Sequence, residues 1–298
     1  MLRRLFAALA VTVVTLLVPS PVFAWSWAGH RLIMQRAIDL LPPAIKPFFV
    51  EHRDEIVYRS IDPDLWRDAG WDEDPNHFVN FGVAEYGPYP FAALPRDHTA
   101  ALEKFGAAAV KRNGTLLWRI PEMVGNLRRA FESFPKGNGL APQQTVLFAA
   151  VASHYMQDAT QPMHVTANYD GQLTDQRGVH GRFEEQLLAR YGSRLTLAPT
   201  SPKSIPSISD YAFTLALAGY KQVDLILKAD KESIGAKDTY DDEYFDAFFA
   251  KMKPVLDEQL SSAITATASM IVTAWEEAGR PALTLPPRQP AKVQRAPR

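Results

Sequence analysis

The sequence predicts an all-α protein, a single-domain multi-helix bundle over residues 25–279. Apolar residues recur at helical spacing in successive segments that are bounded by proline, glycine and capping residues. No convincing pair of strands, no internal repeat and no glycine-rich phosphate loop interrupts this pattern. A chain of 298 residues with 47% hydrophobic content is long enough to bury a sizeable core.

The two ends differ from this domain. Arg3 and Arg4, an apolar run over 5–18 and small residues before Trp25 predict a secretory signal peptide over 1–24. The run is short for a membrane span, although an uncleaved anchor is the alternative. Residues 280–298 are rich in proline and basic residues and predict a disordered tail. We therefore expect a secreted or periplasmic protein with no transmembrane segment after cleavage.

Composition excludes some chemistry. There is no cysteine, so neither disulfides nor thiolate metal ligands can form. Without the two leader arginines and the five basic residues of the tail, 25 basic residues face 33 acidic ones, a formal charge of −8. A long basic groove for polyanions is therefore not expected, although bound divalent cations would make a local site attractive to phosphate.

The first half of the domain predicts short helices separated by turns. We expect helices over 26–41, 43–52, a short piece at 65–68, 97–112 with Asp97 as N-cap, and 115–134. The stretch 60–82 between them is rich in Asp, Pro and Trp and has turn character.

The second half is predicted to hold longer helices. One begins near Pro142 and carries His154, and a polar loop over 167–177 separates it from a helix that carries His180. A proline-rich connector spans 191–209, and Asp210 is expected to cap a helix to 228. The last helix, over 241–278, has a continuous apolar stripe typical of a core helix and contains Pro254 as an expected kink.

Histidines and carboxylates recur at helical spacing in 154–184. His154 with Asp158 and His180 with Glu184 are each four residues apart, which places both side chains on one helix face. If the first helix continues, His164 lies about 80° from His154, and Pro162 can bend the axis to bring it inward. An isolated pair of this kind is ordinarily a surface contact. The repetition among apolar neighbours favours a metal site, and five ligands exceed what one tetrahedral zinc needs.

These residues resemble a known family. The segments HYMQDATQPMH (154–164) and HGRFE (180–184), with Asn168 between them, resemble the core of the zinc-dependent phospholipase C and single-strand-specific zinc nuclease superfamily. The start WSWAGH (25–30) and the segments DLWR (64–67) and PNHF (75–78) resemble its remaining ligand segments. Five segments in the right order, spread over 25–188, make the resemblance specific.

The resemblance implies three Zn²⁺ ions. One is held by Asp64, His77, His154 and a bridging Asp158; a second by His164, His180 and Glu184; the third by His30, Asp158 and the α-amino and carbonyl groups of Trp25. The α-amino ligand exists only after cleavage of the signal peptide. Asp62 lies two residues before Asp64 and is an alternative ligand, or else a turn or capping residue.

The implied activity is hydrolysis of a phosphate ester by a zinc-bound hydroxide. Asp64 could orient or deprotonate the attacking water, and Arg67 could stabilise charge on the phosphoryl oxygens, unless it forms only a structural salt bridge.

The motifs favour two different substrate classes. Asn168 and the Phe183-Glu184 pair favour a phospholipid head group, whereas the Trp25 start resembles the nuclease branch. Phe78 could stack a base, unless it packs in the core, but Asn80 stands where the nucleases read the base with an aspartate. We expect a phospholipase C-like phosphodiesterase. A single-strand nuclease, acting on single-stranded nucleic acid, is the alternative, and a non-enzymatic zinc-binding protein is less expected. No stable protein partner is evident.

Overall fold

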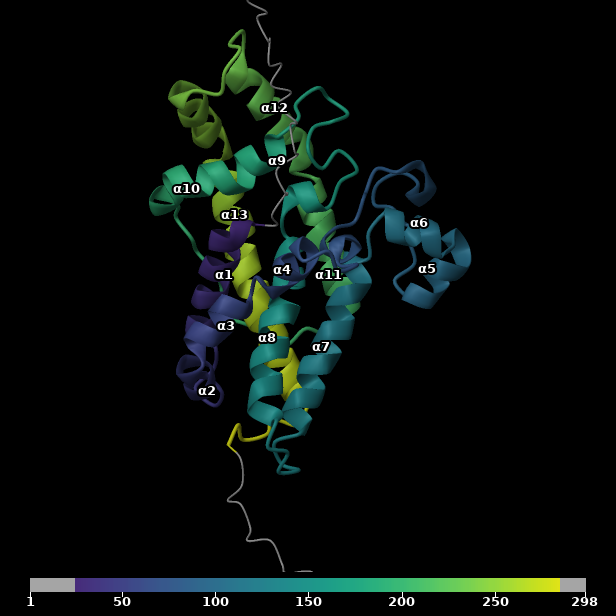
Figure 1. Cartoon of the computed structure of the whole chain (residues 1–298), viewed down its shortest axis with the longest axis vertical. Helices are drawn as coiled ribbons and strands as arrows, with labels where there is room; N and C mark the ends of the chain where they lie inside the picture. The colour runs from purple at the N-terminus through teal and green to yellow at the C-terminus, as the bar shows by residue number, and fades with distance from the viewer. Residues whose placement is uncertain (1–24, 285–298) are drawn as a thin grey trace, which may run out of the picture.

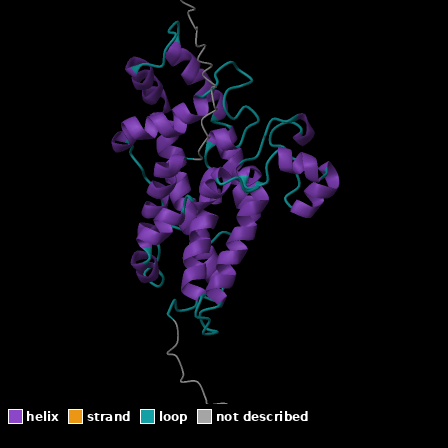
Figure 2. Ribbon diagram, in the orientation of Figure 1, coloured by secondary structure: helices purple, strands orange, loops and turns teal. Residues whose placement is uncertain are grey.

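The structure, a computed structural model, describes residues 25–284, and within that range every regular element is helical. Figure 2 shows only helices and loops. The prediction of an all-α fold is confirmed. The elements are α1 (Ser26–Leu40), α2 (Lys46–Glu51), α3 (Arg53–Arg59), α4 (Asp62–Asp68), η1 (Asp74–His77), η2 (Ala84–Tyr86), α5 (His98–Phe105), α6 (Ala107–Arg112), α7 (Leu116–Glu132), α8 (Ala141–Asp158), η3 (Pro162–His164), α9 (Val179–Gly181), η4 (Arg182–Gln186), α10 (Leu187–Tyr191), η5 (Gly192–Arg194), α11 (Ile208–Tyr220), α12 (Val223–Ile234) and α13 (Asp242–Glu277).

The core lies where α13 packs against α1, α7 and α8, and α7 lies beside α8 (Figure 1). The α7 residues Leu117, Ile120, Val124, Leu127 and Phe131 recur at three- and four-residue spacing, and all are buried. Burying such a side chain contributes roughly 1.5–3 kcal/mol. Because the end of α8 is packed on several sides, its polar residues His154, Gln157 and Asp158 are buried and need polar partners inside the protein.

An extended segment over 196–205 lies along α13. Its backbone N–H groups donate to a row of α13 side chains spaced four residues apart, Asp257, Ser261, Thr265, Ser269 and Thr273. This row of polar side chains satisfies an extended backbone without a sheet. The connector predicted over 191–209 is therefore fixed to the last helix along much of its length.

Several helix boundaries differ from the sequence prediction, and α3 was not predicted as a separate helix. The helix expected over 97–112 is broken at Gly106, whose φ of 78° lies in the left-handed region. The helix expected from Asp210 begins earlier, because Ser207 accepts the backbone N–H of Asp210 and is the N-cap. It also ends at Tyr220, and α12 follows as a separate helix.

Two predictions concern the ends of the chain, the signal peptide and the disordered tail. The signal peptide over 1–24 and the tail from 285 lie outside the described residues. The start of the tail is packed, because Trp275 Nε1 donates to Pro281 O at 2.9 Å and Leu283 contacts the core. Over 25–284, no helix combines the length and the apolar character that crossing a membrane requires.

Candidate metal centre

Seven elements bring the predicted ligands to one place in the bundle. Within the described residues, three groups have ligand atoms within 4.8 Å of one another: His30, His154 and Asp158; Asp64, His77 and His154; and His164, His180 and Glu184. All of these side chains are buried. The first two groups share His154 and form what we call the α8 cluster (His30, Asp64, His77, His154, Asp158). The third is the η4 cluster (His164, His180, Glu184).

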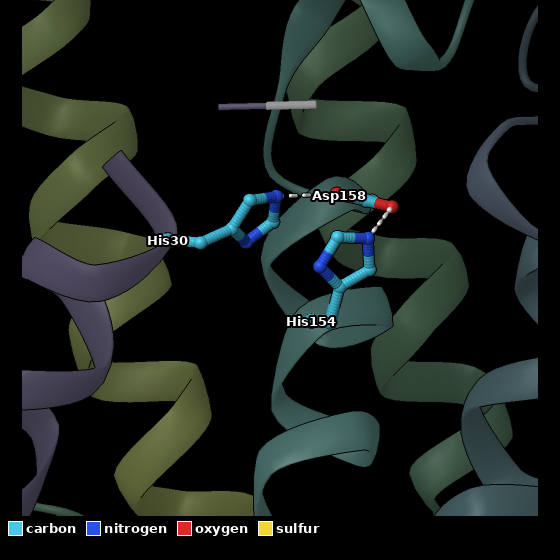
Figure 3. A group of neighbouring side chains, drawn as sticks. All are labelled: His30, His154 and Asp158. Carbon is cyan, nitrogen blue, oxygen red and sulfur yellow. Dashed lines mark ion pairs between the residues drawn. The ribbon is translucent and has the colours of Figure 1, made fainter. Parts of the chain in front are cut away.

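Asp158, at the end of α8, is the centre of the α8 cluster. Its Oδ1 lies 3.4 Å from His30 Nε2, and its Oδ2 lies 3.2 Å from His77 Nδ1 and 3.4 Å from His154 Nε2. Figure 3 shows the α1 histidine and the two α8 side chains pointing toward one another. A carboxylate whose two oxygens face different imidazoles has the geometry to bridge two cations.

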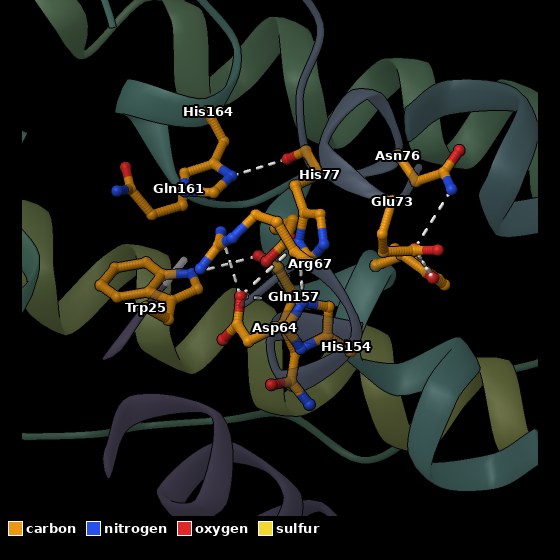
Figure 4. Close-up of polar contacts among 12 residues, drawn as sticks. Trp25, Asp64, Arg67, Glu73, Asn76, His77, His154, Gln157, Gln161 and His164 are labelled. Carbon is orange, nitrogen blue, oxygen red and sulfur yellow. Dashed lines mark hydrogen bonds and ion pairs between the residues drawn. The ribbon is translucent and has the colours of Figure 1, made fainter. Parts of the chain in front are cut away.

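Hydrogen bonds behind the histidines fix which ring nitrogen faces the clusters. Nδ1 of His30 donates to Gln157 Oε1 at 2.6 Å, and Nδ1 of His154 donates to the Ser60 carbonyl at 2.8 Å. Nδ1 of His164 donates to a backbone carbonyl as well, at 2.6 Å (Figure 4). Because a carbonyl oxygen only accepts, these rings carry the proton on Nδ1 and direct an Nε2 lone pair into the centre.

Several polar atoms of the ligand side chains are buried without a well-aligned hydrogen bond, although Asp64 Oδ1 lies 3.3 Å from Arg67 Nη1 and His30 Nε2 lies 3.4 Å from Asp158 Oδ1. They are His30 Nε2, both carboxylate oxygens of Asp64, His77 Nε2, Asp158 Oδ1, His164 Nε2 and His180 Nδ1. Each buried polar atom left in this way costs about 1–3 kcal/mol, and more where the group is charged. Imidazole nitrogens and carboxylate oxygens are the ligands that Zn²⁺ takes when thiolates are absent. The donor set therefore fits divalent zinc.

Burial and neighbouring charges shift the pKa values of the ligands in different directions. Burial raises the pKa of Asp64 to about 6, although His30 and other cations oppose this. Burial lowers the pKa of His164 to about 4. For Asp158 burial acts upward, but the attraction of His154 and hydrogen bonds from the other imidazoles outweigh it, so its pKa lies well below the usual range.

The η4 cluster is built on irregular backbone. α8 ends at Asp158 instead of continuing to His164, and a 3₁₀ turn, η3, places His164. Glu184 lies in a π-helical turn, η4, directly after the short α9 that carries His180. Glu184 Oε2 lies 3.0 Å from His180 Nε2 and 3.9 Å from His164 Nε2, and it accepts Gln161 Nε2 at 2.6 Å. Single π-turns of this kind are frequent at functional sites.

Trp25 lies at the start of α1 with its ring fully buried beside α8. Its indole Nε1 donates to Gln157 O and Thr160 Oγ1, both at 3.1 Å. His30, one and a half turns further along α1, is in the α8 cluster. The backbone conformation at Trp25 is left-handed, with φ of 36°. The structure thus holds the start of the domain against α8, the helix that supplies Asp158.

The structure distinguishes the surroundings of the two candidate aspartates, Asp62 and Asp64, and shows which groups Arg67 contacts. Asp62 pairs with Arg59 at 3.2 Å, whereas Asp64 lies in the α8 cluster. Arg67 Nη1 lies 3.3 Å from Asp64 Oδ1, and its Nη2 lies 3.3 Å from Asp68 Oδ1. Arg67 therefore forms an ion pair with Asp64 and also lines the cavity beside the clusters.

A cavity of about 530 Å³ opens beside the clusters. It is lined by Arg67, Asp68, Asp74, His77, Phe78, Asn80, Arg112, Met163, His164, Tyr169 and His180. Phe78 therefore lies where a substrate would bind. Asn168 does not line the cavity, because its side chain bonds Thr174 Oγ1 and the N–H of Leu173 within its own loop. The neighbouring Tyr169 takes that place.

Sequence reasoning missed Tyr169, Arg112 and Met163 as lining residues, and Gln157 and Gln161 as partners of ligands. Tyr169 and Arg112 carry no motif that marks them, and they reach the cavity through the path of a loop and through the end of α6, respectively. The two glutamines could have been found, because each lies within three residues of a predicted ligand on the same segment.

The fold and the centre define a class: an all-α metalloprotein in which buried imidazoles and carboxylates on many helices surround several cation positions beside an open cavity. A comparison with protein families matches residues 29–263 to zinc dependent phospholipase C. The match covers most of the chain, and the chain belongs to this family. The family and the buried clusters together fit a zinc-dependent hydrolase. A search of curated proteins found no match.

Proposed function

We propose that this chain is an exported phosphodiesterase of the phospholipase C type that holds three Zn²⁺ ions. The observation that carries the proposal is the set of buried imidazoles and carboxylates that seven elements bring together, in a chain of the zinc dependent phospholipase C family. Asp158, whose two oxygens face different imidazoles, supports two neighbouring ions in the α8 cluster, and the η4 cluster supports a third. Export is supported by the leader pattern of residues 1–24.

Bound zinc, Asp64 and Arg67 would have different roles in hydrolysis. Bound zinc would lower the pKa of water and offset negative charge on phosphoryl oxygens. Asp64, buried beside His77 and His154, would orient or deprotonate the attacking water. Arg67, beside Asp64 and the cavity, can donate to a phosphoryl oxygen that becomes more negative in the transition state.

The cavity supports a substrate with a phosphodiester next to a compact polar group. Phe78 and Tyr169 supply aromatic faces, and Asp68 and Asp74 supply acidic groups near the same opening. An aromatic face with nearby carboxylates suits a cationic head group. We therefore place phospholipid ahead of nucleic acid as the substrate.

A single-strand-preferring nuclease is the second candidate, and Phe78 favours it because an aromatic ring in the cavity can also stack a base. The experiment gives the mature chain, beginning at Trp25, phosphatidylcholine vesicles, single-stranded DNA and single-stranded RNA, each with and without chelator. Chelator-sensitive release of phosphocholine alone is the expected result. Release of nucleotides alone selects the nuclease, and no hydrolysis of any substrate selects a non-enzymatic zinc-binding protein.

A further inference from the structure

A buried ion pair lies directly behind the η4 cluster. Arg182 in η4 and Asp230 on α12 are 7% and 1% exposed, and Asp230 Oδ1 accepts from Arg182 Nε at 3.0 Å and lies 2.9 Å from Nη2. Taking two charges out of water costs several kcal/mol per ion before their attraction is counted. Such a pair is retained only with excellent geometry and further hydrogen bonds.

Arg182 has those further bonds, and they fasten the preceding loop. Its Nη1 donates to Arg177 O at 2.8 Å, and its Nη2 donates to Gln176 O at 3.1 Å. The guanidinium also lies 3.9 Å from the centre of the Tyr240 ring. A side chain at Gly178 would place its Cβ 2.9 Å from Arg182 Nη1, and φ of 84° there independently favours glycine. The loop is therefore shaped around the arginine.

Asp230 connects the same loop to two other helices. Its Oδ1 accepts the hydroxyl of Tyr244 on α13 at 2.5 Å, and its Oδ2 accepts Gln176 Nε2 at 2.8 Å. Gln176 Nε2 also donates to Leu227 O on α12 at 2.7 Å. The irregular segment that holds the ligands is thereby fixed to regular helices.

The ligands lie on both sides of the arginine in sequence. His180 precedes Arg182 by two residues and Glu184 follows it by two, so the arginine is the middle of the segment between them. A π-turn is rarer than an α-helical turn. If it ordered only when the ion arrived, the cost of ordering would be subtracted from the affinity of the ion.

We propose that Arg182, Asp230 and Tyr244 are positioning residues that hold η4 in its π-turn and so raise the affinity of the ion bound by His180 and Glu184. This proposal rests on the proposed zinc centre. It identifies the side chains that set the affinity of one of the ions. None of the three side chains is among the ligand groups, so they act through the backbone that carries the ligands. Partners of this kind are worth about 10- to 100-fold in metal affinity.

The test compares Asp230→Asn and Tyr244→Phe with a matched control, Tyr191→Phe. Tyr191 is also buried and donates to an aspartate, Asp246 Oδ1 at 2.7 Å, but it lies outside this network. Each mature protein is equilibrated with buffered free Zn²⁺, and bound zinc is counted by elemental analysis. Absorption of the Co²⁺-loaded forms reports whether the geometry of an ion has changed.

One ion is expected to bind about 10- to 100-fold more weakly in Asp230→Asn and about tenfold more weakly in Tyr244→Phe. The other two ions, and all three in Tyr191→Phe, should bind as in the wild type. A purely structural role would lower the melting temperature of the metal-free protein and leave all three affinities unchanged.

Unchanged zinc affinity in Tyr244→Phe, or equal weakening of all three ions, overturns the proposal. If Asp230→Asn does not fold, Tyr244→Phe alone decides, because it keeps both charges of the pair. Wild-type protein that binds no zinc would instead overturn the proposed function itself.

Discussion

The two clusters of the metal centre reach the same ligand chemistry by different structural means. The α8 cluster draws its residues from four elements that are far apart in sequence, and it converges on one carboxylate at the end of a regular helix. The η4 cluster uses ligands within 21 residues of sequence, on a 3₁₀ turn and a π-turn, and a buried ion pair lies behind it. Tertiary packing thus positions one cluster, and local backbone with its own support positions the other.

Removing Asp158 should have the largest effect, because its two oxygens serve two ion positions. We expect Asp158→Asn to lose two of three zinc ions and to lower kcat/KM by about 10³-fold or more, since metal-ion stabilisation of developing charge is worth several kcal/mol. Elemental analysis and kinetics on the mature protein measure both. Asp224→Asn, an exposed change on α12, is the control. Retention of three ions in Asp158→Asn would show that no bridge exists.

Removing Glu184 should cost one ion only. We expect Glu184→Gln to release the zinc of the η4 cluster while the α8 cluster stays loaded, and to lower kcat/KM by about 10²-fold. Glu185→Gln is a close control, because Glu185 lies in the same π-turn but is exposed to solvent. The comparison between the clusters fails if Glu184→Gln empties both.

An extension of the N-terminus before Trp25 should affect the α8 cluster and not the η4 cluster. If the α-amino group of Trp25 is a ligand beside His30, one extra residue before Trp25 removes it from the α8 cluster. An amine with an ordinary pKa near 8 is easily deprotonated by a bound cation at neutral pH. We expect the extended protein to lose one ion and at least about tenfold in activity, and to keep the ion of the η4 cluster. Equal zinc content and equal turnover in the two forms would contradict this.

The ligand pairs were predictable from sequence, but the shape of the segments that carry them was not. A spacing of four residues between His180 and Glu184 is the same in an α-helix and in a π-turn, so the sequence cannot distinguish the two. His164 lies in the η4 cluster, but not because a helix continues to it, since α8 stops at Asp158. The all-α class followed from strong periodicity, which survives such local errors.

Contacts between distant residues explain the rest of what the sequence left open. Arg182 and Asp230 are 48 residues apart, and neither stands in a pattern that marks it. Asn168 was predicted from the family resemblance, yet its side chain bonds within its own loop, and Tyr169 lines the cavity. Ser207 and Asp210 are both good capping residues, and the choice between them depends on packing of α11 beyond the local sequence.

The smallest expected difference between the two clusters is the pH at which each loses its zinc. In the metal-free protein, burial raises the pKa of Asp64 to about 6. The charge and hydrogen bond of Asp158 raise the pKa of His30 above its usual value, against the effect of burial. Burial lowers the pKa of His164 to about 4. As the pH falls through about 6, protons therefore compete with zinc in the α8 cluster, while His164 stays neutral and needs no deprotonation to bind.

We expect zinc to leave the α8 cluster first between pH 7 and pH 5, with affinity falling about tenfold per pH unit for each proton that competes. Bound zinc is counted after equilibration at fixed free Zn²⁺ across this range. Glu184→Gln protein assigns the loss, because its remaining ions belong to the α8 cluster and should show the same acid profile. If the ion of the η4 cluster leaves first, the raised pKa values of Asp64 and His30 do not control metal release. In that case the order in which the ions leave depends on how the surrounding helices hold each cluster.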